Sequence, residues 1–182
     1  MSAVLETQRL ILRAPQADDI PRLVPLIGDF DISKNLSRVP HPYTERDGHE
    51  FVAKVTETKR ALGHDYAFSI LRKADEAYIG MCGIHPERGW EMGYWIGKPF
   101  WGQGFATEAG ARLIAFGFED LGAERLFAEW FHDNPASGRV LEKLGFQPSG
   151  ETLSNCLARG HRVPSHVVTL DREGYKTRKN MP

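Results

Sequence analysis

Apolar and polar positions along the chain follow two different periods, and these periods divide it into strands and helices. Leu10 and Leu12 alternate with Arg9, Ile11 and Arg13, which predicts a first strand over residues 5–14. Runs rich in β-branched and aromatic residues predict further strands at residues 66–73, 77–85, 90–96, 125–131, 147–153 and 162–170.

Apolar residues at helical spacing separate these strands. Asp18 or Asp19 can cap a first helix that continues to about Ile27, and Thr44 can cap a second from residue 45 to about 62, where Gly63 ends it. Residues 28–42 are expected to be irregular because they contain Pro40 and Pro42. Two more helices are predicted at 109–121, ended by Gly122, and within 134–146, ended by Gly145.

This order of elements predicts one α/β (α+β) domain over residues 1–182. Its central sheet is mixed and mostly antiparallel, with about six to seven strands and about four flanking helices. From about residue 175 to 182 the chain is polar, and we expect a flexible tail there.

Composition excludes several classes of protein. The 182 residues are 41% hydrophobic and 26% charged, with a formal net charge of -1, so we expect neither nucleic acid nor an anionic membrane as the main partner. No apolar run approaches the roughly 20 residues that span a bilayer. The start of the chain lacks the pattern of a signal peptide. Cys82 and Cys156 are far apart, and the histidines have no metal-ligand spacing, so we expect no metal and a cytoplasmic protein.

The most informative segment is Trp101–Glu108, a glycine-containing turn between a predicted strand and a predicted helix. Such a turn directs free backbone N–H groups at one point, and the helix dipole favours negative charge there. Gly102 and Gly104 would let a phosphate oxygen approach the backbone closely. The turn therefore predicts a diphosphate site, although an ordinary strand-to-helix turn has the same local pattern. It matches neither a P-loop nor a Rossmann fingerprint.

Three stretches together resemble the GNAT superfamily of N-acetyltransferases, in its branch of ribosomal-protein N-terminal (Rim-type) enzymes. They are Glu6–Arg13, Glu91–Ile96 with the turn that follows it, and Asn134–Ser137 continued by Glu142–Phe146. They occur in the order and at the spacings of the family. One position departs from its pattern, because Trp101 stands where glutamine or arginine is commonest.

The resemblance implies a GNAT-type sheet whose fourth and fifth strands splay apart to receive acetyl-CoA, the co-substrate. Asn134 and the backbone near Trp95, Ile96 and Gly97 would contact the pantetheine arm. The diphosphate would lie on the turn that follows, at Gly102, Gln103, Gly104, Phe105, Ala106 and Thr107.

The resemblance also implies two catalytic residues. Glu91 would take a proton from the attacking amine, although the same residue could be a solvent-facing strand position. Ser137 would protonate the thiolate of coenzyme A, and a water relay or a hydrogen bond to the sulfur would serve equally. Asn134 followed by Pro135 is also a common way to begin a helix, and this structural role alone would explain both residues.

The predicted activity is acetyl transfer from acetyl-CoA to a primary amine by direct attack on the thioester. The acceptor is a protein or peptide N-terminus or a small amine, and residues 30–43 and 154–163 are expected to line its side of the site. The alternative is a non-catalytic acyl-CoA-binding or interaction module with the same fold. A homodimer is compatible with the resemblance.

Overall fold

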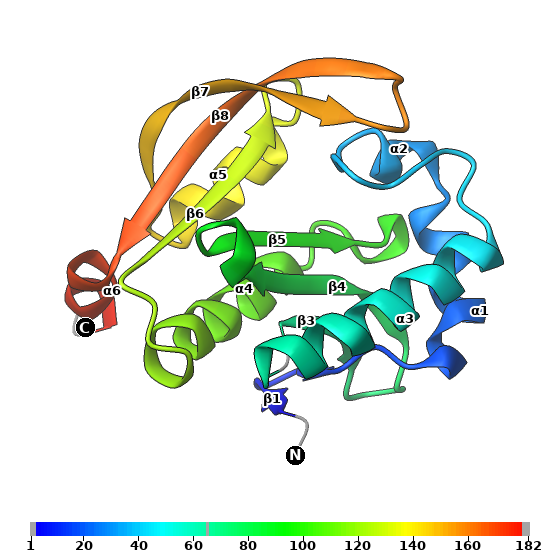
Figure 1. Ribbon diagram of the computed structural model, residues 1–182. Helices are drawn as coiled ribbons and strands as arrows, with labels where there is room; N and C mark the ends of the chain where they lie inside the picture. The colour runs from blue at the N-terminus through cyan, green and yellow to red at the C-terminus, as the bar shows by residue number, and fades with distance from the viewer. Residues whose placement is uncertain (1–2, 65, 180–182) are drawn as a thin grey trace.

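The computed structural model describes residues 3–64 and 66–179, which form one sheet with helices on both faces (Figure 1). The strand predicted at 5–14 is a hairpin, closed by a hydrogen bond from the Thr7 N–H to the Leu10 carbonyl (3.0 Å), and this division gives the sheet its eighth strand. The strands are β1 (Val4–Glu6), β2 (Leu10–Arg13), β3 (Ala67–Arg72), β4 (Tyr78–His85), β5 (Glu91–Ile96), β6 (Arg125–Phe131), β7 (Gln147–Cys156) and β8 (His161–Asp171).

The strand order is β1-β2-β3-β4-β5-β6-β8-β7, and every neighbouring pair except one is antiparallel. The exception is β5 with β6, which are parallel and share a single register pair, Glu91 with Phe127. The two strands therefore diverge beyond Glu91. This gap is the splay predicted between the fourth and fifth strands of the sequence, which are β5 and β6 once the first strand is counted as two.

The helices confirm most of the predicted boundaries. They are α1 (Ile20–Ile27), α2 (Phe30–Ser33), α3 (Glu45–Leu62), α4 (Phe105–Ala115), α5 (Pro135–Lys143) and α6 (Arg172–Lys179). Thr44 caps α3 by accepting a hydrogen bond from the Asp47 N–H, and Gly63 ends it with a φ of 78°. The predicted helix 109–121 begins earlier, at Phe105, and its last turn, Phe116–Asp120, is a π-helix.

Two short helices fall in segments that were expected to be irregular. Within residues 28–42, α2 forms because the Asp29 carboxylate accepts a hydrogen bond from the Asp31 N–H (2.9 Å). At the chain end, α6 extends to Lys179, whereas the sequence led us to expect a tail from about residue 175. Tyr175 holds this helix in place, because its ring stacks on Phe118 with centroids 4.8 Å apart.

Asp19 has a structural role different from the helix cap expected from the sequence. Its buried carboxylate makes no cap bond to α1 and instead accepts hydrogen bonds from Arg13 (2.7 and 2.8 Å), Arg22 (2.9 Å) and Ser69 (3.0 Å). Burial works to raise the pKa of Asp19, but these partners outweigh it and hold that pKa below its usual range. The contacts fasten the start of α1 to β2 and β3.

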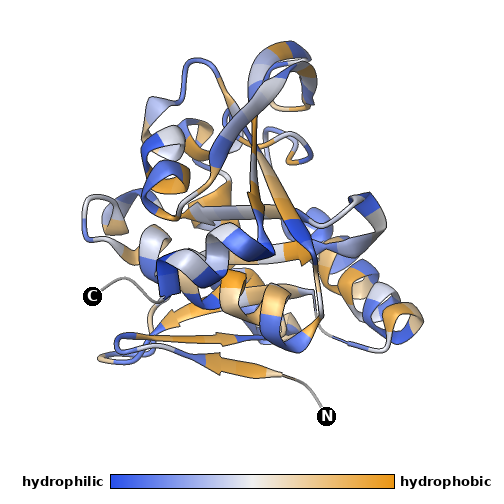
Figure 2. Cartoon of the chain, turned by 90° about the vertical axis from the view of Figure 1, so that its left-hand side faces the viewer, coloured by the Kyte–Doolittle hydropathy of each residue, from blue (hydrophilic) through white to orange (hydrophobic). Residues whose placement is uncertain are grey.

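The core has a layer on each face of the sheet. On one face α4 and α5 pack on β4, β5 and β6, and on the other α1, α2 and α3 pack mainly on β3 and β4. Figure 2 shows the sheet strands largely orange and the helices partly blue toward solvent. A Cβ at Gly110 would lie 2.6 Å from Leu144, so α4 approaches α5 more closely than a larger residue would allow. This packing holds the start of α4 beside the end of β5.

Neither a membrane-spanning helix nor a metal-binding cluster is found in the described part of the chain. Within residues 3–64 and 66–179, no helix is long and apolar enough to cross a bilayer. The same residues contain no group of three or more His, Cys, Asp or Glu side chains that could hold a metal ion. Cys82 and Cys156 are both buried free thiols.

Candidate active site

A cavity of about 1150 Å³ passes through the gap between β5 and β6. Because side chains alternate between the faces of a strand, the cavity has lining residues from both faces of the sheet. Glu91, Gly93 and Trp95 line it on the face where residues 30–37 and 154–161 also contribute, which we call the loop side. Tyr94 lines it on the opposite face, with residues 100–107 and 134–143, which we call the turn side.

On the turn side, the turn before α4 presents a row of backbone donors. Gly102 and Gly104 have φ values of 72° and 79°, in the left-handed region that favours glycine. No carbonyl of the described residues accepts a hydrogen bond from the N–H groups of residues 102–107, and the first helical bond runs from Glu108 N–H to the Gly104 carbonyl. Unpaired N–H groups at the positive end of a helix dipole form an anion site.

Trp101, the residue that departs from the family pattern, fastens this turn to the sheet. Its indole Nε1 donates a hydrogen bond to the Ile96 carbonyl at the end of β5 (2.7 Å), and 47% of the residue is exposed. The indole therefore occupies a strand carbonyl and none of the N–H groups of the turn.

The gap edge of β5 carries backbone groups that β6 does not pair. The Gly97 N–H donates to the Ile79 carbonyl (2.8 Å) toward β4, whereas the Trp90 carbonyl accepts from Phe127 (3.2 Å) toward β6. Successive residues of a strand direct their N–H and C=O groups to opposite edges. The backbone groups of Tyr94 and Ile96 therefore face the gap, while those of Trp95 and Gly97 face β4. Of the three positions predicted for the pantetheine arm, only Ile96 directs its backbone to the gap, and its carbonyl is already bonded to the Trp101 indole.

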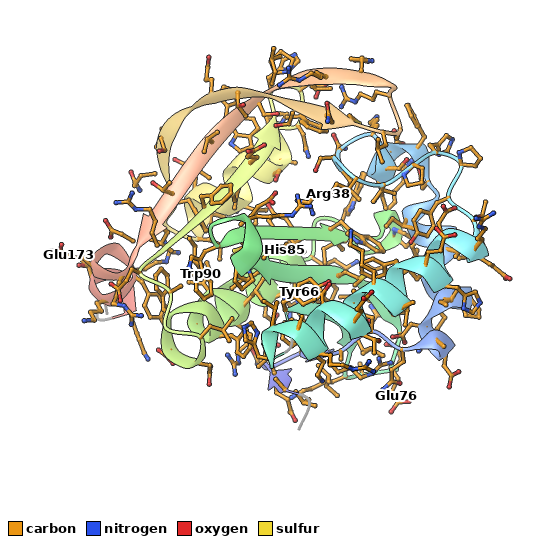
Figure 3. The ribbon with its side chains drawn as sticks, in the orientation of Figure 1. Arg38, Tyr66, Glu76, His85, Trp90 and Glu173 are labelled. Carbon is orange, nitrogen blue, oxygen red and sulfur yellow. The ribbon has the colours of Figure 1, made fainter. Side chains whose placement is uncertain are left out.

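Glu91 lies on the loop side, at the point where β5 and β6 begin to diverge. Its side chain is 19% exposed, and Oε2 forms an ion pair with Arg38 (2.6 Å; Arg38 is labelled in Figure 3) and lies 3.6 Å from Arg88. Arg38 belongs to the segment between α2 and α3, so this contact draws that segment over the start of the gap. Glu91 therefore lines the cavity with its Oε2 near both guanidinium groups.

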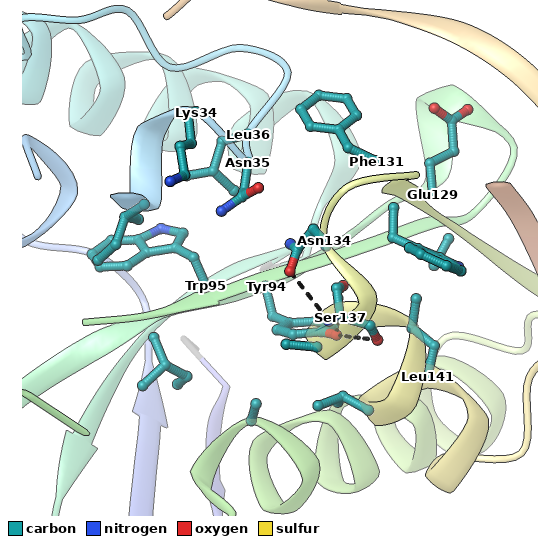
Figure 4. A pocket seen from close by; sticks show the side chains of 18 of the residues that line it. Lys34, Asn35, Leu36, Tyr94, Trp95, Glu129, Phe131, Asn134, Ser137 and Leu141 are labelled. Carbon is teal, nitrogen blue, oxygen red and sulfur yellow. Dashed lines mark hydrogen bonds between the residues drawn. The ribbon is translucent and has the colours of Figure 1, made fainter. Parts of the chain in front are cut away.

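Ser137 lies on the turn side and contacts β5 across the gap (Figure 4). Its Oγ is 2.9 Å from the Tyr94 hydroxyl, which also donates to the Ser137 carbonyl (3.2 Å). Asn134 caps α5 by accepting from the Ser137 N–H (3.4 Å). Burial raises the pKa of Tyr94 to about 12, although the hydrogen bond from Ser137 opposes the shift. The phenol therefore stays neutral near pH 7 and acts as a hydrogen-bonding partner.

The predicted site residues converge on this cavity, with two exceptions. Gly97 packs against Leu26 and pairs with β4, and the Gln103 side chain turns back to donate to the Pro99 carbonyl (3.3 Å). The predicted residues that line the cavity are Glu91, Trp95, Ile96, Gly102, Gly104, Phe105, Ala106, Thr107, Asn134 and Ser137.

On the loop side, two distant segments join to cover the cavity. Arg159 Nε donates to the Lys34 carbonyl (2.7 Å), and the Leu157 N–H donates to the Ser37 carbonyl (3.3 Å). Arg159 also forms two hydrogen bonds with Asp133 at the end of β6 (2.6 and 3.1 Å). In Figure 1 the segment around α2 lies next to the β7–β8 hairpin. The two stretches expected to line the acceptor side therefore both contribute to the lining.

Tyr94 and Glu129 are among the lining residues that were not foreseen from the sequence. Tyr94 lies within a recognised stretch, but its contact with Ser137 depends on how the sheet brings β5 beside α5. Glu129 lines the loop side from β6, two residues beyond the position that pairs with Glu91, and it accepts a hydrogen bond from Ser154. Alternation along the predicted strand 125–131 could have placed Glu129 on the face of Glu91, provided that the parallel register had been known.

Comparison with known proteins identifies the family of this chain. Residues 9–147 match the acetyltransferase (GNAT) domain family. Over 175 residues the chain is 30% identical to p20, an uncharacterized N-acetyltransferase of Bacillus licheniformis, in an alignment covering 94% of this chain and 97% of that protein. The chain therefore belongs to the GNAT acetyltransferase family, and it is an acyltransferase.

Solved structures share the fold. A GNAT-family acetyltransferase from Bacillus anthracis matches with a TM-score of 0.81 and 21% identity, over 94% of this chain and 99% of that one. The ribosomal L7/L12 alpha-N-protein acetyltransferase RimL, in complex with coenzyme A, matches with a TM-score of 0.77 and 18% identity, over 94% and 99%. The resemblance inferred from the sequence is confirmed for the family, and these two structures show the same fold.

Proposed function

We propose that this protein transfers the acetyl group of acetyl-CoA to a primary amine. The observation that carries the proposal is the cavity, which joins an anion site on one side of the sheet to a carboxylate, Glu91, on the other. A thioester donor with a diphosphate would bind from the turn side, and an amine would approach from the loop side. The two reactants would meet in the gap between β5 and β6.

The residues present fit acetyl-CoA. The diphosphate would accept hydrogen bonds from the N–H groups of residues 102–107, and the amide groups of the pantetheine arm would pair with the gap edge of β5 at the backbone of Tyr94 and the N–H of Ile96. Bound there, acetyl-CoA supplies an activated carbonyl carbon with a thiolate leaving group. Asn134 contributes through the N-terminus of α5, which it caps.

Glu91 and Ser137 have complementary roles in the proposed reaction. A bond forms between the amine nitrogen and the acetyl carbon, and the carbon–sulfur bond breaks. Glu91 accepts the proton that the nitrogen loses. Ser137 Oγ donates a hydrogen bond to the departing thiolate, or passes it a proton that a water molecule returns to Ser137. Tyr94 orients Ser137 for this contact. The products are an N-acetylated amine and the free thiol of coenzyme A.

We infer the class of acceptor from the loop side of the cavity. The covered loop side and the likeness to enzymes such as RimL support a slender acceptor whose terminal amine reaches the gap, as a peptide N-terminus does. Gly93 supports it as well, because a Cβ there would meet nothing within 4 Å and the approach to β5 is open at that point. Small primary amines fit the same opening.

Incubation of the purified protein with acetyl-CoA and a panel of peptides and small amines tests the proposal. We expect release of free thiol that depends on the amine, with the acetylated product identified by mass spectrometry. Binding of coenzyme A without transfer to any amine would instead favour a non-catalytic acyl-CoA-binding module.

A further inference from the structure

The hairpin between β1 and β2 makes contacts with the phosphate turn that the proposed reaction does not use. Glu108, in the first turn of α4, accepts hydrogen bonds at Oε1 from the Thr7 hydroxyl (2.6 Å) and the Arg9 N–H (2.9 Å). Its Oε2 accepts from Arg9 Nε (2.6 Å). The guanidinium of Arg9 also lies over the Phe105 ring, 4.5 Å from its centroid. We call Thr7, Arg9 and Glu108 the hairpin clamp.

Arg9 also controls the direction of one peptide plane in the turn. Its Nη1 donates to the Gln103 carbonyl (3.0 Å). In a trans peptide the carbonyl of one residue and the N–H of the next point in opposite directions. Because Arg9 holds the Gln103 carbonyl on its own side, the Gly104 N–H points away from Arg9. Gly104 has a φ of 79°, and a Cβ added there would lie 3.5 Å from Arg9 Nη2, so Arg9 borders the turn at this residue as well.

The clamp also removes an electrostatic conflict. A carboxylate in the first turn of a helix is favourable by itself, but here it would repel a diphosphate bound at the same helix end. Burial works to raise the pKa of Glu108, yet the hydrogen bonds from Thr7 and Arg9 outweigh it and keep that pKa below its usual range. Glu108 is therefore charged near pH 7, with its charge balanced by Arg9 at 2.6 Å.

We propose that Arg9 is a positioning residue for the diphosphate of acetyl-CoA, acting through Glu108 and the Gln103 carbonyl rather than as a phosphate ligand. The inference rests on the proposed function. It extends the site to the first strands of the chain, which lie outside the cavity lining. The planar guanidinium is essential to this role, because a lysine cannot donate to Glu108 and to the Gln103 carbonyl with the same fixed geometry.

Coenzyme A binding by Arg9→Met and Arg9→Lys, measured by calorimetry, tests the clamp without requiring any acetyl transfer. We expect both variants to bind coenzyme A about tenfold more weakly than the wild type, as expected for the loss of one charge-assisted hydrogen bond. Retained affinity in Arg9→Lys with loss in Arg9→Met would overturn the proposal, since Arg9 would then act as a simple positive charge. Unchanged affinity in both variants would also overturn it.

A truncated donor separates positioning from general damage. With S-acetylpantetheine, which lacks the diphosphate, kcat/KM of both variants should stay within about twofold of the wild type. Equal losses with acetyl-CoA and S-acetylpantetheine would indicate a folding defect and contradict the proposal. Thr7→Val, which removes one bond to Glu108, provides a milder second variant. Arg46→Met is the matched control, because Arg46 is an exposed arginine on α3 that pairs with Glu50.

If the wild-type protein binds coenzyme A but acetylates no amine, the proposed function fails while the calorimetric test of the clamp stands. If it acetylates amines and Arg9→Met behaves as the wild type does, the clamp fails alone.

Discussion

The turn at residues 101–108 and the segment at residues 30–37 line the same cavity but offer it different chemical groups. The turn presents backbone N–H groups held by two glycines with positive φ. The segment presents side chains and carbonyls, and several groups in and beside it are already paired with the β7–β8 hairpin or with β5, as the Lys34 carbonyl is with Arg159 and Arg38 is with Glu91. The turn therefore has unpaired groups for a ligand, whereas several groups of the segment are already paired with neighbouring elements.

Because of this difference, side chains on the loop side can change while the turn side still binds the same ligand. A row of N–H groups suits any diphosphate and depends little on side-chain identity. Contacts such as Arg159 with Asp133 depend on individual side chains and can change without altering the sheet. Variants on the turn side should therefore change the parameters for acetyl-CoA, and variants on the loop side should change those for the amine.

Glu91→Gln should have the largest effect and tests whether the loop side carries chemistry as well as binding. We expect kcat to fall by about two to four orders of magnitude, the range for loss of a general base. The KM for acetyl-CoA should change little. The measurement is steady-state thiol release together with a thermal melt, and a loss of less than threefold in a folded variant would remove Glu91 from this role.

Glu129→Gln is the matched control for Glu91, because both carboxylates line the loop side, where Glu91 pairs with Arg38 and Glu129 accepts a hydrogen bond from Ser154. If Glu91 is the base, Glu129→Gln should lower kcat by less than about threefold, apart from effects on amine binding. A larger loss of kcat in Glu129→Gln than in Glu91→Gln, in the same assay, would transfer the proposed role to Glu129.

Ser137→Ala should have the next largest effect. Loss of the donor to the sulfur should lower kcat by about 10- to 100-fold, at or below the usual range for a general acid. Tyr94→Phe leaves Ser137 in place without its partner and should lower kcat less, by about three- to tenfold. The affinity for coenzyme A can be measured without any amine, and it should stay within about twofold of the wild type in both variants. A greater loss in Tyr94→Phe than in Ser137→Ala would show that the phenol is the more important group.

Gly104→Ala tests the turn side alone. The residue has a φ of 79°, and a side chain in this region costs about 1–2 kcal/mol, which is about a tenfold change in an equilibrium constant. We expect weaker binding of coenzyme A by calorimetry, with an unchanged KM for the amine once acetyl-CoA is saturating. An increased amine KM with normal coenzyme A affinity would contradict the division between the two sides.

Arg159→Gln tests the loop side and should have the smallest effect. It breaks the pair with Asp133, whose side chain is 44% exposed, and we expect the KM of the amine to change by about threefold with no change for acetyl-CoA. The hydrogen bond from Arg159 holds the pKa of Asp133 below its usual range. The pair is therefore intact above about pH 4 and is lost as the pH falls through the lowered pKa. A KM difference between wild type and variant that changes between pH 6 and 8 would argue against this pair as its cause.

The parts of the molecule that could be predicted from sequence are those governed by local chemistry. Thr44 and Gly63 mark the ends of α3 because capping depends on a few neighbouring residues, and Gly102 with Gly104 marks the turn before α4 for the same reason. The sequence could not predict that the Asp19 carboxylate makes no cap bond to α1, because its partners Arg13 and Ser69 come from two separate strands. The Tyr94–Ser137 contact and the clamp on Glu108 are likewise products of the sheet, and their members lie 43 and about 100 residues apart.

The position of Trp101 makes its fluorescence sensitive to ligand binding at the turn. The chain contains four tryptophans, and this indole lines the cavity, is bonded to the Ile96 carbonyl and is partly exposed to solvent. A ligand on the turn would displace water from it, so the emission of Trp101 should follow donor binding in solution without any added label. Trp101→Phe would identify its share of the signal, and the residue that departs from the family pattern would become the reporter of the site.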